Sequence, residues 1–103
     1  MAYCLSYRIA DKSANGKSYA ERRQQLVDNV YSDNGFWEET TSFIIVNSEL
    51  STLAFAEKAC TGLSAADDLV IVFDPEDMNA AYFGPLEHEA VLASFFKSLK
   101  KLP

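Results

Sequence analysis

The apolar segment Leu69–Phe73 (LVIVF) limits the folds open to this chain more than any other stretch. A strand with one face in water alternates apolar and polar residues, whereas an unbroken apolar run between Asp68 and Asp74 is typical of a strand covered on both faces. We therefore expect a sheet with material on each side of this strand, supplied by the chain's own last helix or by a partner subunit.

Hydrophobic periodicity places further elements around this strand. Alternation of large and small side chains predicts a first strand over residues 3–9, and the aromatic, Thr and Ile content of Phe36–Asn47 predicts two short strands. Helices are expected from Ser18 to about Asp33, from Ser51 to about Leu63, and from Pro85 to about Leu99. The predicted order is strand, helix, strand, strand, helix, strand, helix.

The first six of these elements match a ferredoxin-like βαββαβ plait. We therefore predict an α+β fold, with an antiparallel sheet, an extra carboxyl-terminal helix and one domain spanning residues 1–103. Because the first two helices would cover only one sheet face, the covered character of Leu69–Phe73 also predicts a homodimer that forms through the other face.

Composition indicates a compact protein and disfavours nucleic acid as a partner. Hydrophobic residues make up 49% of the 103-residue chain, and the formal charge of -6 repels a phosphate backbone. The sequence shows neither an apolar run long enough to span a bilayer nor a signal-peptide pattern, so we expect a cytoplasmic protein. Cys4 and Cys60 fall within predicted elements and are expected to be buried thiols.

Residues 11–18 (DKSANGKS) nearly match the phosphate-binding loop G-x-x-x-x-G-K-[ST], with Asp11 in place of the first Gly. Lys12, Lys17 and Arg8 would then form an anion or nucleotide site. The alternative makes Gly16 a turn residue and Ser18 a helix cap, which we favour, since Asp11 would repel phosphate and the chain is short for a nucleotide-hydrolysing domain.

Three segments carry a family resemblance: Tyr3–Tyr7, Gly16–Tyr19 and Phe36–Val46, which includes FWEETTSFIIV. Together with Asp67–Ile71 and Tyr82–Pro85, they resemble the small SinR-like proteins, a family similar in fold to the CRISPR-associated adaptation endoribonucleases. The resemblance covers nearly the whole chain and implies a dimer of plaits.

In the nuclease relatives, an Asp that closes the first strand is the expected metal-binding residue, contributed by each subunit. Arg8 occupies that position here, and a guanidinium offers only donors and repels Mg²⁺. The resemblance thus implies the fold without the usual catalytic group. Asp11, in the following loop, is the candidate that could replace it, with Mg²⁺ as the cofactor in that case only.

Other candidate residues favour structural roles. We expect Arg8 to contact Asp68, because a plait places the end of its first strand beside the start of its fourth, although Arg8 could instead hold a phosphate or a partner carboxylate. The acidic residues 74, 76 and 77 match no calcium loop, and His88 has no nucleophile near it in sequence. The aromatic pairs at residues 36–37 and 82–83 fit a core or dimer contact better than base stacking.

These observations lead to three functional hypotheses. The first is a small homodimeric interaction protein that binds through Arg8, Lys12 or Lys17 and needs no cofactor. The second is a metal-dependent nuclease, acting on RNA or DNA, that uses Asp11. The third is an anion or nucleotide sensor built on the loop that contains Lys12 and Lys17.

Overall fold

The computed structural model describes residues 1–103 as six strands and three helices in an α+β arrangement. In chain order the elements are β1 (Ala2–Arg8), α1 (Tyr19–Val30), β2 (Phe36–Trp37), β3 (Phe43–Asn47), α2 (Thr52–Ala59), β4 (Leu69–Phe73), β5 (Asn79–Phe83), α3 (Glu89–Ala93) and β6 (Ser98–Lys101).

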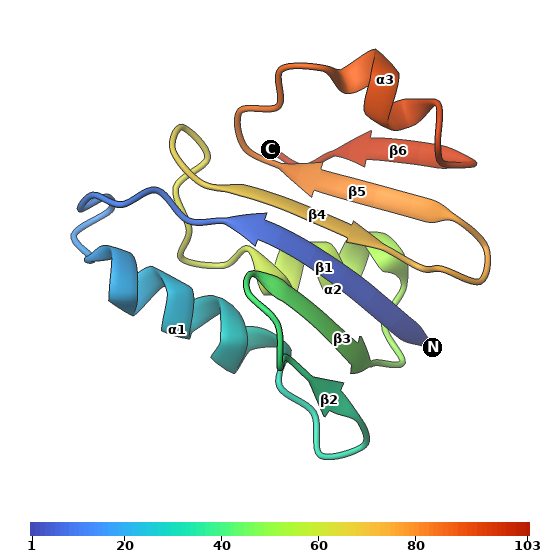
Figure 1. The fold of residues 1–103 in the computed structure, drawn as a ribbon, viewed down its shortest axis with the longest axis horizontal. Helices are drawn as coiled ribbons and strands as arrows, with labels where there is room; N and C mark the ends of the chain where they lie inside the picture. The colour runs from blue at the N-terminus through green and yellow to red at the C-terminus, as the bar shows by residue number, and fades with distance from the viewer.

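All six strands form one sheet in the order β2-β3-β1-β4-β5-β6 (Figure 1). Neighbouring strands from β2 to β5 are antiparallel, while β5 and β6 are parallel. The sheet is therefore mixed, and the prediction of a wholly antiparallel sheet was wrong at this one edge. β1 and β4 lie at the centre, where each is paired on both sides.

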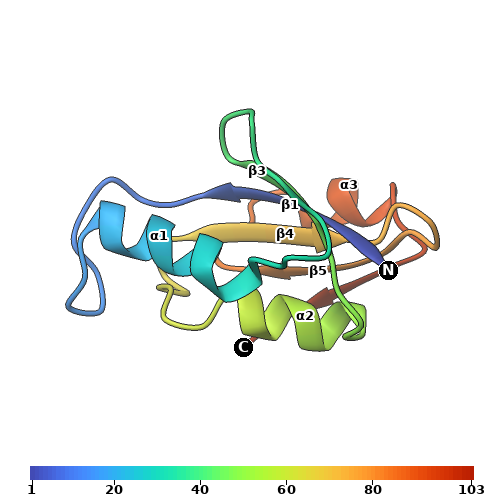
Figure 2. The ribbon, with the colours of Figure 1, turned by 90° about the horizontal axis from the view of Figure 1, so that it is seen from below.

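Helices α1 and α2 lie together on one face of the sheet, and α3 lies on the other (Figure 2). The core fills the space between the sheet and α1 and α2. Because side chains alternate along a strand, every second residue of β1 points into this core. The buried core residues are Tyr3, Leu5, Tyr7, Ile9, Leu26, Val30, Ile44, Val46, Phe55, Ala56, Ala59, Cys60, Leu63, Val70, Val72, Ala81, Phe83 and Leu102.

Both long helices begin where their capping residues predict. The Ser18 side chain accepts the N–H of Glu21, and the Glu21 carboxylate accepts the N–H of Ser18, which completes a capping box. Ser51 caps α2 in the same way, by accepting the N–H of Ala54. Helix α1 ends at Val30, three residues before the predicted end, because Tyr31 adopts an extended backbone with φ -53° and ψ 139°.

The carboxyl-terminal region departs from the prediction of one helix between Pro85 and Leu99. Only Glu89–Ala93 is α-helical, and Ser98–Lys101 forms β6 instead. The N–H of Lys97 donates to the Met78 carbonyl, and the Ser98 hydroxyl donates to Asn79. Pairing with the free edge of β5 therefore outweighs the helical periodicity of the last residues.

Strand β5 was absent from the sequence prediction. It follows a turn in which the Asp74 carboxylate accepts the N–H of Glu76, and Asp77 accepts that of Asn79. Met78 closes the turn with a φ of 60°. The acidic residues after β4 thus form the turn that sends the chain back beside it.

The second sheet face is covered in part by the chain itself. The ring of Phe96, just beyond α3, packs on Phe73 with 5.3 Å between ring centroids. The Tyr82 hydroxyl hydrogen-bonds the Glu89 carboxylate, which ties α3 to β5. These contacts join the α3 segment to β4 and β5 on this side, and the loop between β2 and β3 projects on the same side (Figure 2).

Candidate functional site

A fully buried ion pair organises the region around the end of β1. The Nε and Nη2 atoms of Arg22, on α1, donate to the two Asp68 carboxylate oxygens at 2.9 and 3.1 Å, and both side chains are 0% exposed. The expected contact between Arg8 and Asp68 is therefore wrong, because Asp68 faces α1 and is already occupied by Arg22.

The remaining donors of Arg22 hold the loop between β1 and α1. Its Nη1 atom donates to the carbonyls of Lys12 and Lys17 at 2.8 and 3.0 Å, and Nη2 donates to the carbonyl of Ala10 at 2.9 Å. All five guanidinium N–H groups thus have acceptors. The Arg22 side chain alone therefore holds three backbone carbonyls of this loop.

Asp68 has equally complete bonding. Its carboxylate also accepts the backbone N–H groups of Ala10 and Ser64, each at 2.9 Å. Burial opposes ionisation of this carboxyl, but the hydrogen bonds from Arg22, Ser64 and Ala10 outweigh burial and lower its pKa. The pair is therefore charged at neutral pH and ties β4, the β1–α1 loop and α1 together.

The near phosphate-loop sequence forms a tight turn. Ala14 and Lys17 exchange two backbone hydrogen bonds of 2.9 and 3.0 Å, and Asn15 and Gly16 between them have φ values of 53° and 73°. Such a pair of positive φ values is typical of a two-residue hairpin turn, for which Asn-Gly is the favoured sequence. The N–H groups of Ala14 and Lys17 are engaged within the turn and do not point outward to a ligand.

The two loop lysines each have a partner within the chain. Lys12 forms an ion pair with Asp67 at 3.1 Å, and Lys17 donates to the Gln25 side chain at 3.1 Å. The hydrogen bond from the Ser64 hydroxyl lowers the pKa of the Asp67 carboxyl most, and the hydrogen bond from Lys12 lowers it further. Asp11 is exposed, and its carboxylate forms neither a hydrogen bond nor an ion pair within the chain.

Arg8 lies on the opposite face of the sheet from these lysines. Its register with Leu69 and the alternation along β1 point it away from α1 and α2. There it lines a groove of about 370 Å³ between the end of β1 and the segment around α3, which includes Leu69, Leu92 and Phe95. Arg8, Lys12 and Lys17 therefore do not converge on one site.

The Arg8 groove continues into an apolar surface that we call the open face. It is formed by the outward residues of β1 to β4 and by α3, with Phe95 68% and Val91 59% exposed. Its apolar members are Trp37, Phe43, Ile45, Leu69, Ile71, Val91, Leu92 and Phe95. Four of the ten exposed large hydrophobic residues lie on this face: Trp37, Ile45, Val91 and Phe95.

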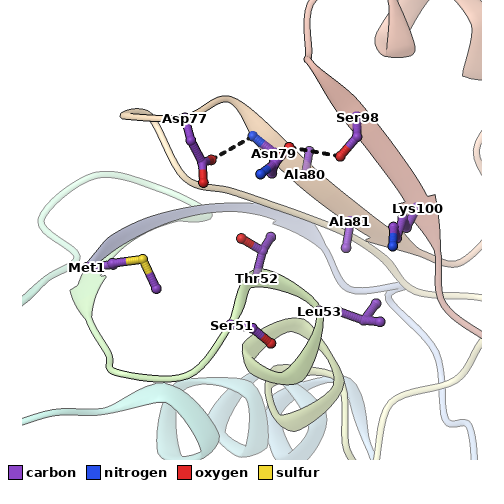
Figure 3. Close-up of a pocket in the computed structure, with 10 residues that line it drawn as sticks. All are labelled: Met1, Ser51, Thr52, Leu53, Asp77, Asn79, Ala80, Ala81, Ser98 and Lys100. Atoms are coloured by element: carbon purple, nitrogen blue, oxygen red, sulfur yellow. Dashed lines mark hydrogen bonds between the residues drawn. The ribbon is translucent and has the colours of Figure 1, made fainter.

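A second hollow, of about 410 Å³, lies between the start of α2 and the β5–β6 edge (Figure 3). Four of its polar residues have structural partners: Ser51 caps α2, Asp77 accepts the N–H of Asn79, and the Ser98 hydroxyl donates to the Asn79 side chain. This hollow is held together by its own hydrogen bonds and brings no nucleophile or base to a common point.

Groups suited to metal or thiol chemistry are not assembled in this structure. No cluster of three or more His, Cys, Asp or Glu side chains is placed to hold a metal ion. Both cysteines are free and buried, and burial raises the pKa of Cys60 to about 12, which suppresses its thiolate at neutral pH. His88 is exposed, 3.9 Å from Glu87.

Sequence reasoning missed Arg22, although a signal for it was present. Arg22 precedes Leu26 by four residues and Val30 by eight, so it belongs to the apolar stripe of α1. A cation on a buried stripe needs a buried anion, and Asp68 beside the apolar β4 is the matching residue. The Arg8 groove had no such signal, because it depends on where the last segment folds.

Comparisons with protein-family models, with curated proteins and with solved structures found no match. None of the helices has both the length and the apolar character required to cross a membrane.

Proposed function

We propose that this chain is a small homodimeric interaction protein, which acts by binding and not by catalysis. The observation that carries the proposal is the open face, where apolar side chains of β2, β3 and α3 stand exposed beside the unpaired Arg8. A second copy is the occupant proposed for this face, because an isologous contact buries the same apolar patch twice.

The proposal includes a ferredoxin-like plait of the SinR-like kind. The order β2-β3-β1-β4, with antiparallel neighbours and with α1 and α2 on one face, supports this topology. Strands β5 and β6 extend the sheet beyond the plait. Both cysteines are free, which fits the reducing cytoplasm that we propose as the location.

Binding without chemistry is favoured by the residues at the end of β1. Arg8 stands where the resemblance to the adaptation nucleases would require an Asp, and its guanidinium cannot ligate Mg²⁺. Asp11 lies in the loop with no second carboxylate gathered beside it. A protein partner also fits the net charge of -6 better than a nucleic acid does.

The experiment that separates binding from catalysis is a cleavage assay. Purified protein is incubated with labelled RNA and with labelled DNA, in Mg²⁺ and in chelator, beside the Asp11→Ala variant. We expect the substrates to stay intact in every reaction. Chelator-sensitive cleavage that is lost in Asp11→Ala would establish the nuclease alternative instead.

A further inference from the structure

The groove beside Arg8 contains two opposite charges that do not meet within one chain. Arg8 and Glu87 both line it, yet neither forms an ion pair with the other, and the Glu87 side chain is 89% exposed. The one ion pair that Glu87 forms is with its sequence neighbour His88, at 3.9 Å. Each charge is therefore available to a partner.

Apolar side chains surround these charges. Leu69 and Leu92 line the groove, as do Val91 on α3 and Phe95 two residues beyond the end of that helix, and both Val91 and Phe95 are largely exposed. Phe96 turns the other way, onto Phe73, so the exposure of Phe95 is not shared by every aromatic residue of this segment. The patch thus combines exposed apolar side chains, Val91 and Phe95, with the apolar lining of the groove. Its two charged groups are Arg8 and Glu87.

Such a patch is self-complementary under two-fold symmetry. In an isologous contact residue i of one subunit meets residue j of the other, and j meets i, so a patch that holds one cation and one anion pairs both of them twice. A partner with a uniformly acidic surface would match Arg8 but would be repelled by Glu87. A second copy of this chain satisfies both groups.

We propose that the two-fold axis of the homodimer passes through the Arg8 groove, an inference that rests on the homodimer proposed above. Arg8 of each protomer pairs with Glu87 of the other, while Val91 and Phe95 pack against the opposing copy. These apolar side chains supply the buried area, and the two reciprocal ion pairs fix the register of the subunits.

Charge reversal tests this arrangement in the full-length protein. The dimer dissociation constant is measured by sedimentation equilibrium for the wild type, Arg8→Glu, Glu87→Arg and the double variant. Each single reversal places two like-charged pairs in the interface and should weaken the dimer by about tenfold or more, because like-charge contacts cost several kcal/mol. The double variant should recover wild-type affinity to within about threefold.

Matched controls lie on α2, on the far side of the sheet, where Lys58→Glu and Glu57→Arg make the same charge changes at exposed positions. They should dimerise as the wild type does. Urea unfolding should show that every variant is folded, since Arg8 and Glu87 have no structural partner to lose beyond His88.

The outcomes distinguish the two proposals. A monomeric wild type overturns both of them. A dimeric wild type whose affinity is unchanged by Arg8→Glu or Glu87→Arg, or not recovered in the double variant, overturns the Arg8–Glu87 arrangement alone and leaves the homodimer in place.

Discussion

At the scale of single residues, the Arg22–Asp68 pair accounts for the shape of the β1–α1 loop. One guanidinium meets one carboxylate and three backbone carbonyls, and the carboxylate accepts two further N–H groups. A buried pair often contributes little net stability, because desolvation offsets the attraction. Here the pair also satisfies backbone groups of the loop, so its removal would orphan them.

Arg22→Met should therefore lower the free energy of unfolding by about 3 to 5 kcal/mol, since it leaves a buried carboxylate unpaired. The double variant Arg22→Met/Asp68→Leu should not recover this loss, because the carbonyls of Ala10, Lys12 and Lys17 stay without donors. Urea denaturation measures both values. Recovery of wild-type stability in the double variant would show that the backbone contacts of Arg22 contribute little.

The lowered pKa of Asp68 gives a pH dependence with a definite sign. A carboxyl whose pKa is lower in the folded state stabilises the protein above its unfolded value of 3.8, and this stabilisation is lost as pH falls through the folded value. Asp68→Asn does not titrate. The stability advantage of the wild type over Asp68→Asn should be constant near neutral pH and shrink below about pH 4, as followed by urea unfolding across pH. An advantage independent of pH would contradict the assignment.

At the scale of elements, two glycines with positive φ should respond very differently to the same change. Gly84 has φ +102°, and a Cβ there would lie 1.8 Å from the Asp68 carbonyl oxygen. Gly16 has φ +73°, with nothing within 4 Å of a Cβ. Gly84 thus lies where the end of β5 closely approaches the start of β4, whereas Gly16 lies in a turn with open space around it.

Gly84→Ala should cost more than about 3 kcal/mol of unfolding free energy, because backbone must move to admit the methyl group. The matched variant Gly16→Ala should cost only about 1 kcal/mol, the strain of a left-handed alanine. Thermal and urea unfolding of the pair give the comparison. Equal losses at the two positions would contradict the close packing of Gly84.

The elements also show how far sequence reasoning reaches. Helices α1 and α2 were predicted because Ser18 and Ser51 combine local capping with an apolar stripe. Residues 94–99 satisfied a helical pattern too, but strand pairing with β5 is a long-range interaction that no local pattern contains. β5 was missed because its Asn-Ala-Ala start has low strand propensity and gains its stability from β4 and β6.

The candidate site, too, was predicted only in part from the sequence. Arg8 was singled out from its position at the end of β1, and its side chain is exposed in the structure. Its expected partner was wrong, because proximity along the sheet does not say which face a side chain occupies. The Arg8 groove could not be predicted, since residues 85–95 reach it only after the last segment turns back over the sheet.

At the scale of the whole molecule, the two faces of the sheet differ in how far helices cover them. One side has α1 and α2 over a continuous core, while on the other side the α3 segment contacts β4 and β5 through Phe96 and Glu89. The covered character of Leu69–Phe73 is thus explained only in part within one chain. A second copy on the open face would complete the layer that the apolar run requires.

A charge placed at the centre of the open face should disrupt that contact. Ile45 is 38% exposed on β3, opposite Cys4 of β1, and Leu53 on α2 is comparably exposed on the far side. Ile45→Glu should convert the dimer to monomer with a stability change below about 1 kcal/mol, while Leu53→Glu should leave the dimer intact. Gel filtration of both variants provides the test. Disruption by Leu53→Glu alone would place the interface elsewhere.

The most direct test of the central claim is the mass of the wild-type protein in solution. Sedimentation equilibrium at micromolar concentration should give twice the 11.5 kDa mass of one chain, with reversible dissociation on dilution. A single species at the mass of one chain, unchanged up to the highest concentration measured, would contradict the homodimer and the role assigned to the open face.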